Sequence, residues 1–148
     1  MNTTTKRFIL ATLKDHRLMT LATNRTDGFP HATTVAFAND GLTLYFACDR
    51  ASQKVRNIER SKKVSLTVDH DEANWKQIKG LSMGAVAEVL TKKADIARAR
   101  ALLAKRFPGM FESDEDAAET AFVRVRPKVI SVIDYTRGFG HTELVRAA

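Results

Sequence analysis

Two turn signals near the start of the chain separate three segments of β-type sequence. The turns are TDG at residues 26–28 and NDG at residues 39–41, and an Asp-Gly pair between such segments is typical of a β-hairpin. The flanking segments are 17–25, which alternates in places, and 30–38 and 42–48, which contain β-branched and aromatic residues that favour strands. We therefore expect three strands joined by two tight turns, an antiparallel meander.

The rest of the chain predicts further strands and three helices. The predicted strands lie at 63–70, 75–90 and 120–135, and the predicted helices at 3–15, 51–60 and 92–107. Gly80 and Gly84 are expected to mark bulges or tight bends in their strand. The acidic segment 111–119 is expected to be an exposed connector or short helix. The glycine-containing tail after residue 135 is expected to hold little regular structure.

These elements predict a single domain over residues 1–148 with an α+β, mainly β, fold. The strands come in hairpins instead of alternating with helices, which favours an antiparallel sheet. Six or seven short strands usually close into a barrel, because closure removes the exposed edges of the sheet. About three helices would then flank the barrel or close one end.

The composition fits one globular domain. The chain has 148 residues, of which 44% are hydrophobic and 28% charged, enough to enclose one core. No apolar run approaches the roughly 20 residues of a membrane span, and the first residues do not form a signal peptide. With Cys48 as the single cysteine, a disulfide framework is excluded and a cytoplasmic location is expected.

The basic segment 49–63 leaves three interpretations open: a nucleic-acid surface, a solvated helix face, or a pocket for one phosphate. The net charge of +7 favours anionic partners without choosing among them. Ser52, Gln53 and Lys54 open a predicted helix directly after a strand, where free backbone N–H groups attract a phosphate. The later basic side chains are expected to stay in solvent: Arg56, Arg60 and Lys63. Nucleic-acid binding is less favoured, because only 7% of residues are aromatic and no RNP-like motif is present.

No catalytic or metal site is predicted from the residues themselves. The histidines are scattered, and segment 69–72 (DHDE) lacks the spacing of a calcium loop, so a solvated turn is the better interpretation. Cys48 is interpreted as a small buried hydrophobe, and segment 138–141 (GFGH) as a turn. The chain contains no nucleophile elbow, Walker loop or dinucleotide fingerprint.

The order of these features resembles a known family. Residues 27–68, DGFPHATTVAFANDGLTLYFACDRASQKVRNIERSKKVSLTV, together with GLSMGAVAEVL at 80–90 and VISVIDYTRGFGHTE at 129–143, resemble the pyridoxamine 5′-phosphate oxidase-like family of FMN-binding split β-barrels. The resemblance runs from about residue 18 to residue 143. It implies an antiparallel split barrel and a homodimer with FMN bound at the subunit interface.

The resemblance also implies a set of cofactor-binding positions. These are Thr33, Thr34, Val35, Ala36, Ala47, Cys48, Ser52, Gln53, Lys54, Trp75, Lys79 and His141. The first four run beside the flavin ring, mainly through backbone contacts, and the next two border the flavin or its ribityl chain. The three at the helix start hold the phosphate, and the last three are expected to reach the flavin of the other subunit.

The function implied is an FMN-dependent oxidoreductase that passes hydride or electrons between the flavin and an unidentified small molecule. Lys79 is a candidate for stabilising the reduced flavin. Oxidation of pyridoxamine phosphate is not favoured, because Arg137, His141 and Arg146 differ from the pattern of the oxidase, and His31 stands where such oxidases carry arginine. Three alternatives stay open: F420 or haem in the same barrel, a flavin module for storage or sensing without turnover, and a small nucleic-acid-binding barrel.

Overall fold

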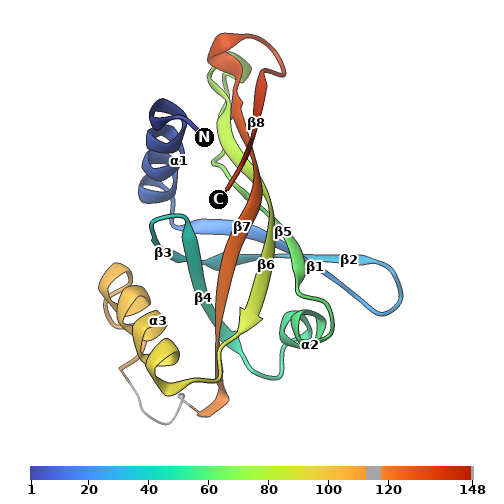
Figure 1. Cartoon of the computed structure of the whole chain (residues 1–148), viewed down its shortest axis with the longest axis vertical. Helices are drawn as coiled ribbons and strands as arrows, with labels where there is room; N and C mark the ends of the chain where they lie inside the picture. The colour runs from blue at the N-terminus through green and yellow to red at the C-terminus, as the bar shows by residue number, and fades with distance from the viewer. Residues whose placement is uncertain (113–117, 148) are drawn as a thin grey trace.

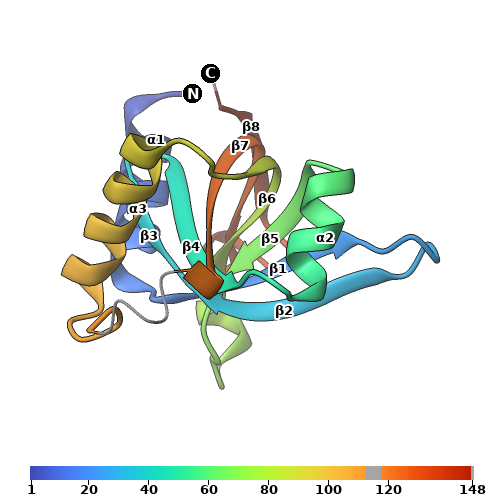
Figure 2. The same ribbon diagram turned by 90° about the horizontal axis from the view of Figure 1, so that it is seen from below.

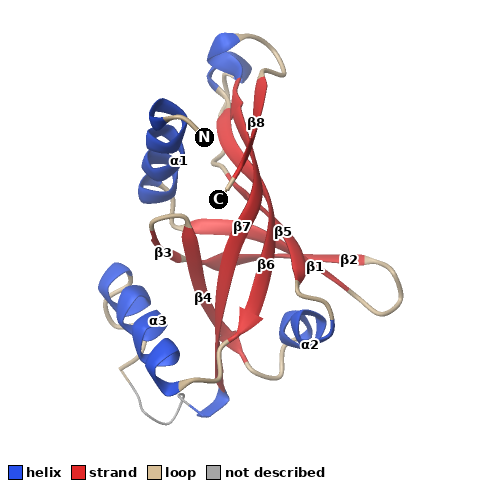
Figure 3. Ribbon diagram, in the orientation of Figure 1, coloured by secondary structure: helices blue, strands red, loops and turns tan. Residues whose placement is uncertain are grey.

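The computed structural model describes residues 1–112 and 118–147 and consists of one curled antiparallel sheet with three α-helices around it (Figure 1 and Figure 3). Seven strands follow one another in the order β2-β1-β5-β6-β7-β4-β3, and β8 pairs with β7 off this path. The elements are α1 (Thr3–Asp15), β1 (Leu18–Asn24), β2 (Pro30–Ala36), β3 (Ala38–Asp40), β4 (Thr43–Asp49), α2 (Gln53–Arg60), β5 (Lys63–Val68), η1 (Trp75–Gln77), β6 (Lys79–Val89), α3 (Lys93–Arg106), β7 (Thr120–Asp134), η3 (Tyr135–Arg137) and β8 (Thr142–Arg146). The predicted α+β split barrel is confirmed.

The expected three-stranded meander is wrong, because the second strand is divided at Phe37. Its first part, β2, pairs with β1 as far as Ala36 opposite Leu18. The Phe37 N–H then donates to the Arg17 carbonyl at 3.0 Å, and the second part, β3, pairs with β4 instead. β2 and β3 therefore lie at opposite ends of the strand order although they are consecutive in the chain. This division curls the sheet, so that β1 and β2 run across the direction of β4 and β7 (Figure 1).

The barrel interior is filled by the alternate residues of its strands. In β5 the alternate residues Val64, Leu66 and Val68 are all buried. They join a core to which α1 contributes two fully buried side chains, Ile9 and Leu13. On the other side of β4 lies α3 (Figure 2). This helix contributes to a second apolar cluster together with Tyr45 of β4 and Phe122 of β7. Each fully buried aliphatic or aromatic side chain contributes about 1.5–3 kcal/mol relative to exposure, so packing across the sheet is the main source of stability.

The long hairpin of β6 and β7 contains both glycines expected to mark irregularities. The pairing register shifts between Gly84 and Ala85, where Gly84 faces Val129 and Ala85 faces Pro127. Lys128 is therefore the extra residue of a β-bulge. Gly80 has another role, because a Cβ placed on it would lie 2.9 Å from the Val68 carbonyl oxygen. Its missing side chain allows close approach of the backbone that follows β5.

Substituting Gly80 by alanine is expected to destabilise the fold by about 1–3 kcal/mol, the usual cost of overpacking. The contact atom belongs to the backbone, so it cannot move away as a flexible side chain would. Gly84→Ala is the matched control, because a Cβ at that position meets nothing within 4 Å. Urea unfolding midpoints measure both changes, and equal midpoints for the two variants would contradict the close approach.

The C-terminal tail is more regular than expected. After the short helix η3, residues Thr142–Arg146 form β8 and pair with Val129–Ile133 of β7. The tail therefore extends the sheet at its far end, where η1 and η3 also lie. The middle of the predicted acidic connector, residues 113–117, lies outside the described residues. In the part of the chain that the structure describes, no helix is long and apolar enough to cross a membrane.

Candidate functional site

The start of α2 presents unsatisfied hydrogen-bonding groups. Ser52 occupies the N-cap position with extended backbone, but its side chain makes no capping hydrogen bond. Its hydroxyl lies 3.7 Å from the Cys48 sulfur instead. The first N–H groups of a helix have no intrahelical acceptor and carry partial positive charge. These amides are therefore available to an anion, and the Ser52 hydroxyl, which donates to the Cys48 sulfur, lies beside them.

Lys54 is the free cation at this helix start. Arg50 donates to the Thr120 carbonyl at 3.0 Å, and Arg56 donates to the Ala51 carbonyl at 2.5 Å and to Gln53 Oε1 at 2.8 Å. Arg56 is exposed, as expected, but its guanidinium folds back over the first turn of the helix. Among the described residues, the Lys54 ammonium has no hydrogen bond or ion pair, so its charge is available for a ligand.

The side-chain amide of Gln53 is hydrogen-bonded within the protein. Its Nε2 donates to Asn57 Oδ1 at 2.8 Å, and Asn57 Nδ2 donates to Thr23 Oγ1 of β1 at 3.0 Å. Asn57 and Thr23 are both 1% exposed. This buried chain of hydrogen bonds, which the sequence analysis missed, ties α2 to β1 and fixes the direction of the helix start.

Two polar atoms on β2 are buried without a partner among the described residues: His31 Nδ1 and Thr33 Oγ1. In the strand pairing, His31 lies opposite Thr23 and Thr33 opposite Leu21. Both therefore lie on the face of β1 and β2 that Asn57 of α2 contacts. A buried polar group without a partner costs about 1–3 kcal/mol, so these atoms fit a site that a polar ligand completes. FMN, with its phosphate, ribityl hydroxyls and ring carbonyls, matches that requirement.

The other predicted strand positions do not all face this site. Val35 belongs to the core, whereas Thr34 lies exposed on the opposite face of β2, on the same side as the half-buried Ala36. The Ala47 side chain packs against the cluster under α3, and only Cys48 faces the barrel interior. At Thr34, Ala36 and Ala47 the side chains therefore do not point towards His31 and Thr33, and any contact with a ligand there would come from the backbone.

Burial raises the pKa of the Cys48 thiol, and the hydrogen bond from Ser52 and the charge of Lys54 only partly oppose this effect. The thiol therefore stays protonated at neutral pH, which agrees with its interpretation as a buried hydrophobe and not a nucleophile.

Alkylation of Cys48, the sole cysteine, provides a measurement of this pKa. Only the thiolate reacts with iodoacetamide, so a raised pKa moves the rate increase to higher pH in the native protein than in the urea-unfolded chain. At pH 8 the native protein is expected to react several-fold more slowly. A native rate profile with its midpoint at or below that of the unfolded chain would contradict the assignment.

Trp75 and Lys79 lie far from the α2 start within one chain. The Ala87 N–H donates to the Lys62 carbonyl directly after α2, and Lys79 begins the same strand eight residues earlier. At about 3.3 Å per residue, Lys79 lies roughly 26 Å from Ala87 along β6. Trp75 stands beside Phe139, with ring centroids 5.6 Å apart, and both rings are largely exposed.

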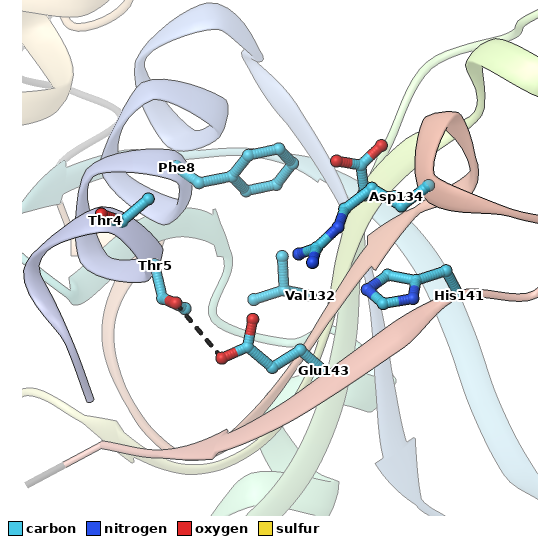
Figure 4. A pocket seen from close by; sticks show the side chains of 8 residues that line it. Thr4, Thr5, Phe8, Val132, Asp134, His141 and Glu143 are labelled. Carbon is cyan, nitrogen blue, oxygen red and sulfur yellow. Dashed lines mark hydrogen bonds between the residues drawn. The ribbon is translucent and has the colours of Figure 1, made fainter.

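His141 does not join that aromatic group. Its side chain lines a cavity beside α1 together with Thr5 and Glu143 (Figure 4). The structure therefore divides the predicted cofactor-binding residues into three groups. The positions on β2, β4 and α2 form the first group. Trp75 and Lys79 lie just before and at the start of β6, and His141 lies beside α1.

A row of small hydroxyl side chains crosses the outer face of the sheet. The strand pairings place these residues side by side: Thr34, Thr20, Thr67, Ser82 and Ser131. Leu18 and Leu144 lie on the same face and are 55% and 64% exposed. This face therefore carries small side chains in its middle and two exposed leucines at its borders.

Sequence comparison gives one clear match. The family model described as pyridoxamine 5′-phosphate oxidase matches residues 5–134 of the chain. None of the curated proteins matches it.

Solved structures with the same fold are numerous. A candidate pyridoxamine 5′-phosphate oxidase of Listeria innocua is 22% identical, with a TM-score of 0.72 over 88% of this chain and 98% of that one. A conserved hypothetical protein of Mycobacterium tuberculosis is 25% identical, with a TM-score of 0.76 over 100% and 94%. The haem storage protein HutZ of Vibrio cholerae is 19% identical, with a TM-score of 0.72 over 82% and 89%. The similarities to the Listeria and Vibrio proteins establish the fold alone.

Proposed function

This chain belongs to the pyridoxamine 5′-phosphate oxidase family, and from that membership we propose that it binds FMN and acts as a flavin-dependent oxidoreductase on a small molecule. The observation that carries the proposal is the start of α2. There the first amides of the helix, the Ser52 hydroxyl and the Lys54 ammonium stand next to a strand face with two buried polar atoms that have no partner among the described residues. A phosphate would bind the groups at the helix start, and a polar chain attached to that phosphate would give the two atoms on β2 their hydrogen-bond partners.

The residues of the chain would divide the binding among them. The first amides of α2, the Ser52 hydroxyl and the Lys54 ammonium hold the phosphate, which carries a charge of about −1.5 to −2 at pH 7. Thr33 and His31 offer hydrogen bonds from β2 to the remaining polar groups of the cofactor. FMN, when bound, would supply hydride and single-electron transfer, which is the chemistry of the flavin itself. The protein supplies position, exclusion of water and the charges that favour one redox state.

We place the active form of this protein in a homodimer. Within one chain Trp75 and Lys79 lie roughly 20 Å or more from the phosphate site, by the length of β6. A second copy packed against this outer face, with its row of small hydroxyl side chains, would bring its own Trp75 and Lys79 towards the first copy's cofactor. Small side chains allow two sheet faces to approach closely, and the exposed Leu18 and Leu144 supply apolar area at the rim.

Ser82→Arg is expected to convert the dimer to a monomer. Ser82 stands in the middle of the hydroxyl row, where a long charged side chain would be buried without a partner, at a cost of several kcal/mol. Sedimentation velocity measures the mass. Ala101→Arg, on the exposed surface of α3, is the control and should stay dimeric. A dimeric Ser82→Arg protein, or a monomeric wild type, would refute this interface.

Titration of the cofactor-free protein with FMN tests the function directly. We expect one FMN per chain, quenched flavin fluorescence, weaker binding of riboflavin, and reduction of the bound flavin by NADH or NADPH. Binding without reduction by either donor would point to a flavin module without turnover. Absence of any flavin binding would overturn the proposal.

A haem-binding module is the second candidate, and the similarity to a haem storage protein favours it. Its signature is a Soret band after addition of haemin to the apoprotein, with no binding of FMN. F420 is distinguished in the same titration by its own absorption. The spectrum of the reconstituted protein therefore separates the three cofactors.

A further inference from the structure

A cavity on the α1 side of the sheet collects charged groups of both signs. It has a volume of about 150 Å³ and is lined by Thr4, Thr5, Phe8, Val132, Asp134, Arg137, His141 and Glu143. Figure 4 shows the ring of Phe8, the imidazole of His141 and the carboxylates of Asp134 and Glu143 around it. These residues come from α1, the end of β7, η3 and β8. Except for His141, none of them belongs to the proposed cofactor site.

The strand register places these groups on one side of the sheet. Val132 pairs with Glu143, so the two side chains share a face, and Asp134 joins them two residues further along β7. The Asp134 N–H donates to the His141 carbonyl at 3.1 Å, which holds the imidazole beside them. The Thr5 hydroxyl of α1 donates to Glu143 Oε1 at 3.2 Å and closes the opposite wall.

The charged groups leave much of their hydrogen-bonding capacity unused. Asp134 Oδ1 accepts from the N–H and hydroxyl of Thr136, and Glu143 Oε1 accepts from Thr5, which leaves one oxygen of each carboxylate available. In the described part of the chain, Arg137 makes no ion pair with either carboxylate, and the imidazole of His141 makes no hydrogen bond. Opposite charges that line one cavity without pairing suit a ligand that carries both signs.

We propose that this cavity binds a small zwitterion, a free neutral amino acid. Its carboxylate bonds to Arg137 and His141, its ammonium to Glu143 and Asp134, and its side chain faces Phe8 and Val132. A purely anionic ligand would face two carboxylates, and a purely cationic one would face the guanidinium of Arg137, whereas a zwitterion complements both. A cavity of about 150 Å³ accommodates a molecule of benzene size, which restricts the ligand to amino acids such as alanine and valine.

Isothermal titration of the purified protein with four probes tests the proposal. Alanine and valine carry both charges, propylamine carries only the ammonium, and propionate carries only the carboxylate. We expect both amino acids to bind and each single-charge probe to bind at least about tenfold more weakly, the effect of losing one charged hydrogen bond. No heat from either amino acid, or propylamine binding as tightly as alanine, would overturn the proposal.

Two variants at the cavity and one control locate the binding. Arg137→Gln and Glu143→Gln each remove one charge while keeping a polar side chain, and each is expected to weaken alanine binding at least about tenfold. Arg146→Gln, at the exposed end of β8, is expected to leave it unchanged. FMN affinity, measured in parallel, should be the same in all three variants, so failure of this site is distinct from failure of the cofactor site. Unchanged alanine binding in either cavity variant would refute the assignment.

Discussion

Lys54→Gln is expected to weaken FMN binding by about 10- to 100-fold. A hydrogen bond to a charged group contributes about 1.5–3 kcal/mol, and each 1.4 kcal/mol corresponds to about a tenfold change in affinity. Arg50 and Arg56 cannot replace the lost charge without breaking their own hydrogen bonds to Thr120 and to Ala51 and Gln53. Fluorescence titration of the apoprotein with FMN measures the change.

Riboflavin, which lacks the phosphate, shows whether Lys54 acts on that group. Its affinity is expected to be the same for the wild type and for Lys54→Gln, so the preference for FMN over riboflavin should shrink by the same factor as the FMN affinity. Lys63→Gln, at the exposed start of β5, is the matched control. Equal losses of affinity for FMN and riboflavin would mean that Lys54 supports the fold of the site and does not bind the phosphate. If neither affinity falls, Lys54 is not part of the binding site.

The start of α2 was predictable because short-range sequence determines it. A strand ends at Asp49, a residue with N-cap preference follows at Ser52, and the helix begins at Gln53 as the structure shows. The spacing along the helix also explains which side chains bond to Gln53. Arg56 and Asn57 stand three and four residues after Gln53, the separation at which helical side chains meet, and both bond to its amide.

The division at Phe37 was not predictable from local pattern. Residues 30–38 look like one strand, because β propensity does not tell which neighbour each half will pair with. The pairing partner is decided by long-range register, which places β2 on β1 and β3 on β4. β8 was missed for the same reason: its short sequence becomes a strand because β7 offers a free edge beside it.

The unpartnered atoms of His31 and Thr33 are likewise a tertiary feature. Their spacing of two residues predicts a common face of β2, but the burial of these atoms depends on how the strands and helices pack around that face. The family resemblance implied that this strand contacts the cofactor mainly through its backbone. The structure adds two side-chain atoms on the same strand that could bond to a ligand. The same limit applies to the charged cavity beside α1, whose residues are brought together from both ends of the chain.

Phe37→Ala is expected to lower the free energy of unfolding by about 3–5 kcal/mol, the range for truncating a fully buried phenylalanine. Phe37 is 0% exposed and belongs to the main core. It also stands where the chain passes from one end of the sheet to the other, and the guanidinium of Arg106 lies over its ring at 4.9 Å. Arg106 in turn donates to the Leu13 and Lys14 carbonyls at the end of α1. Loss of the ring therefore opens a cavity at the junction of β2, β3, α1 and α3.

Urea unfolding followed by circular dichroism measures this loss as a lower midpoint at an unchanged m value. Phe139→Ala is the matched control: that ring is 81% exposed, and its removal should change stability by less than about 0.5 kcal/mol. If Phe37→Ala does not fold, Phe37→Leu provides a milder truncation with a smaller loss of the same sign. The expected thermal signature is a lower Tm for both Phe37 variants, in the order wild type, leucine, alanine. A Phe37→Ala protein within about 1 kcal/mol of the wild type would show that the ring is replaceable at this junction, because neighbouring side chains would then have filled its place.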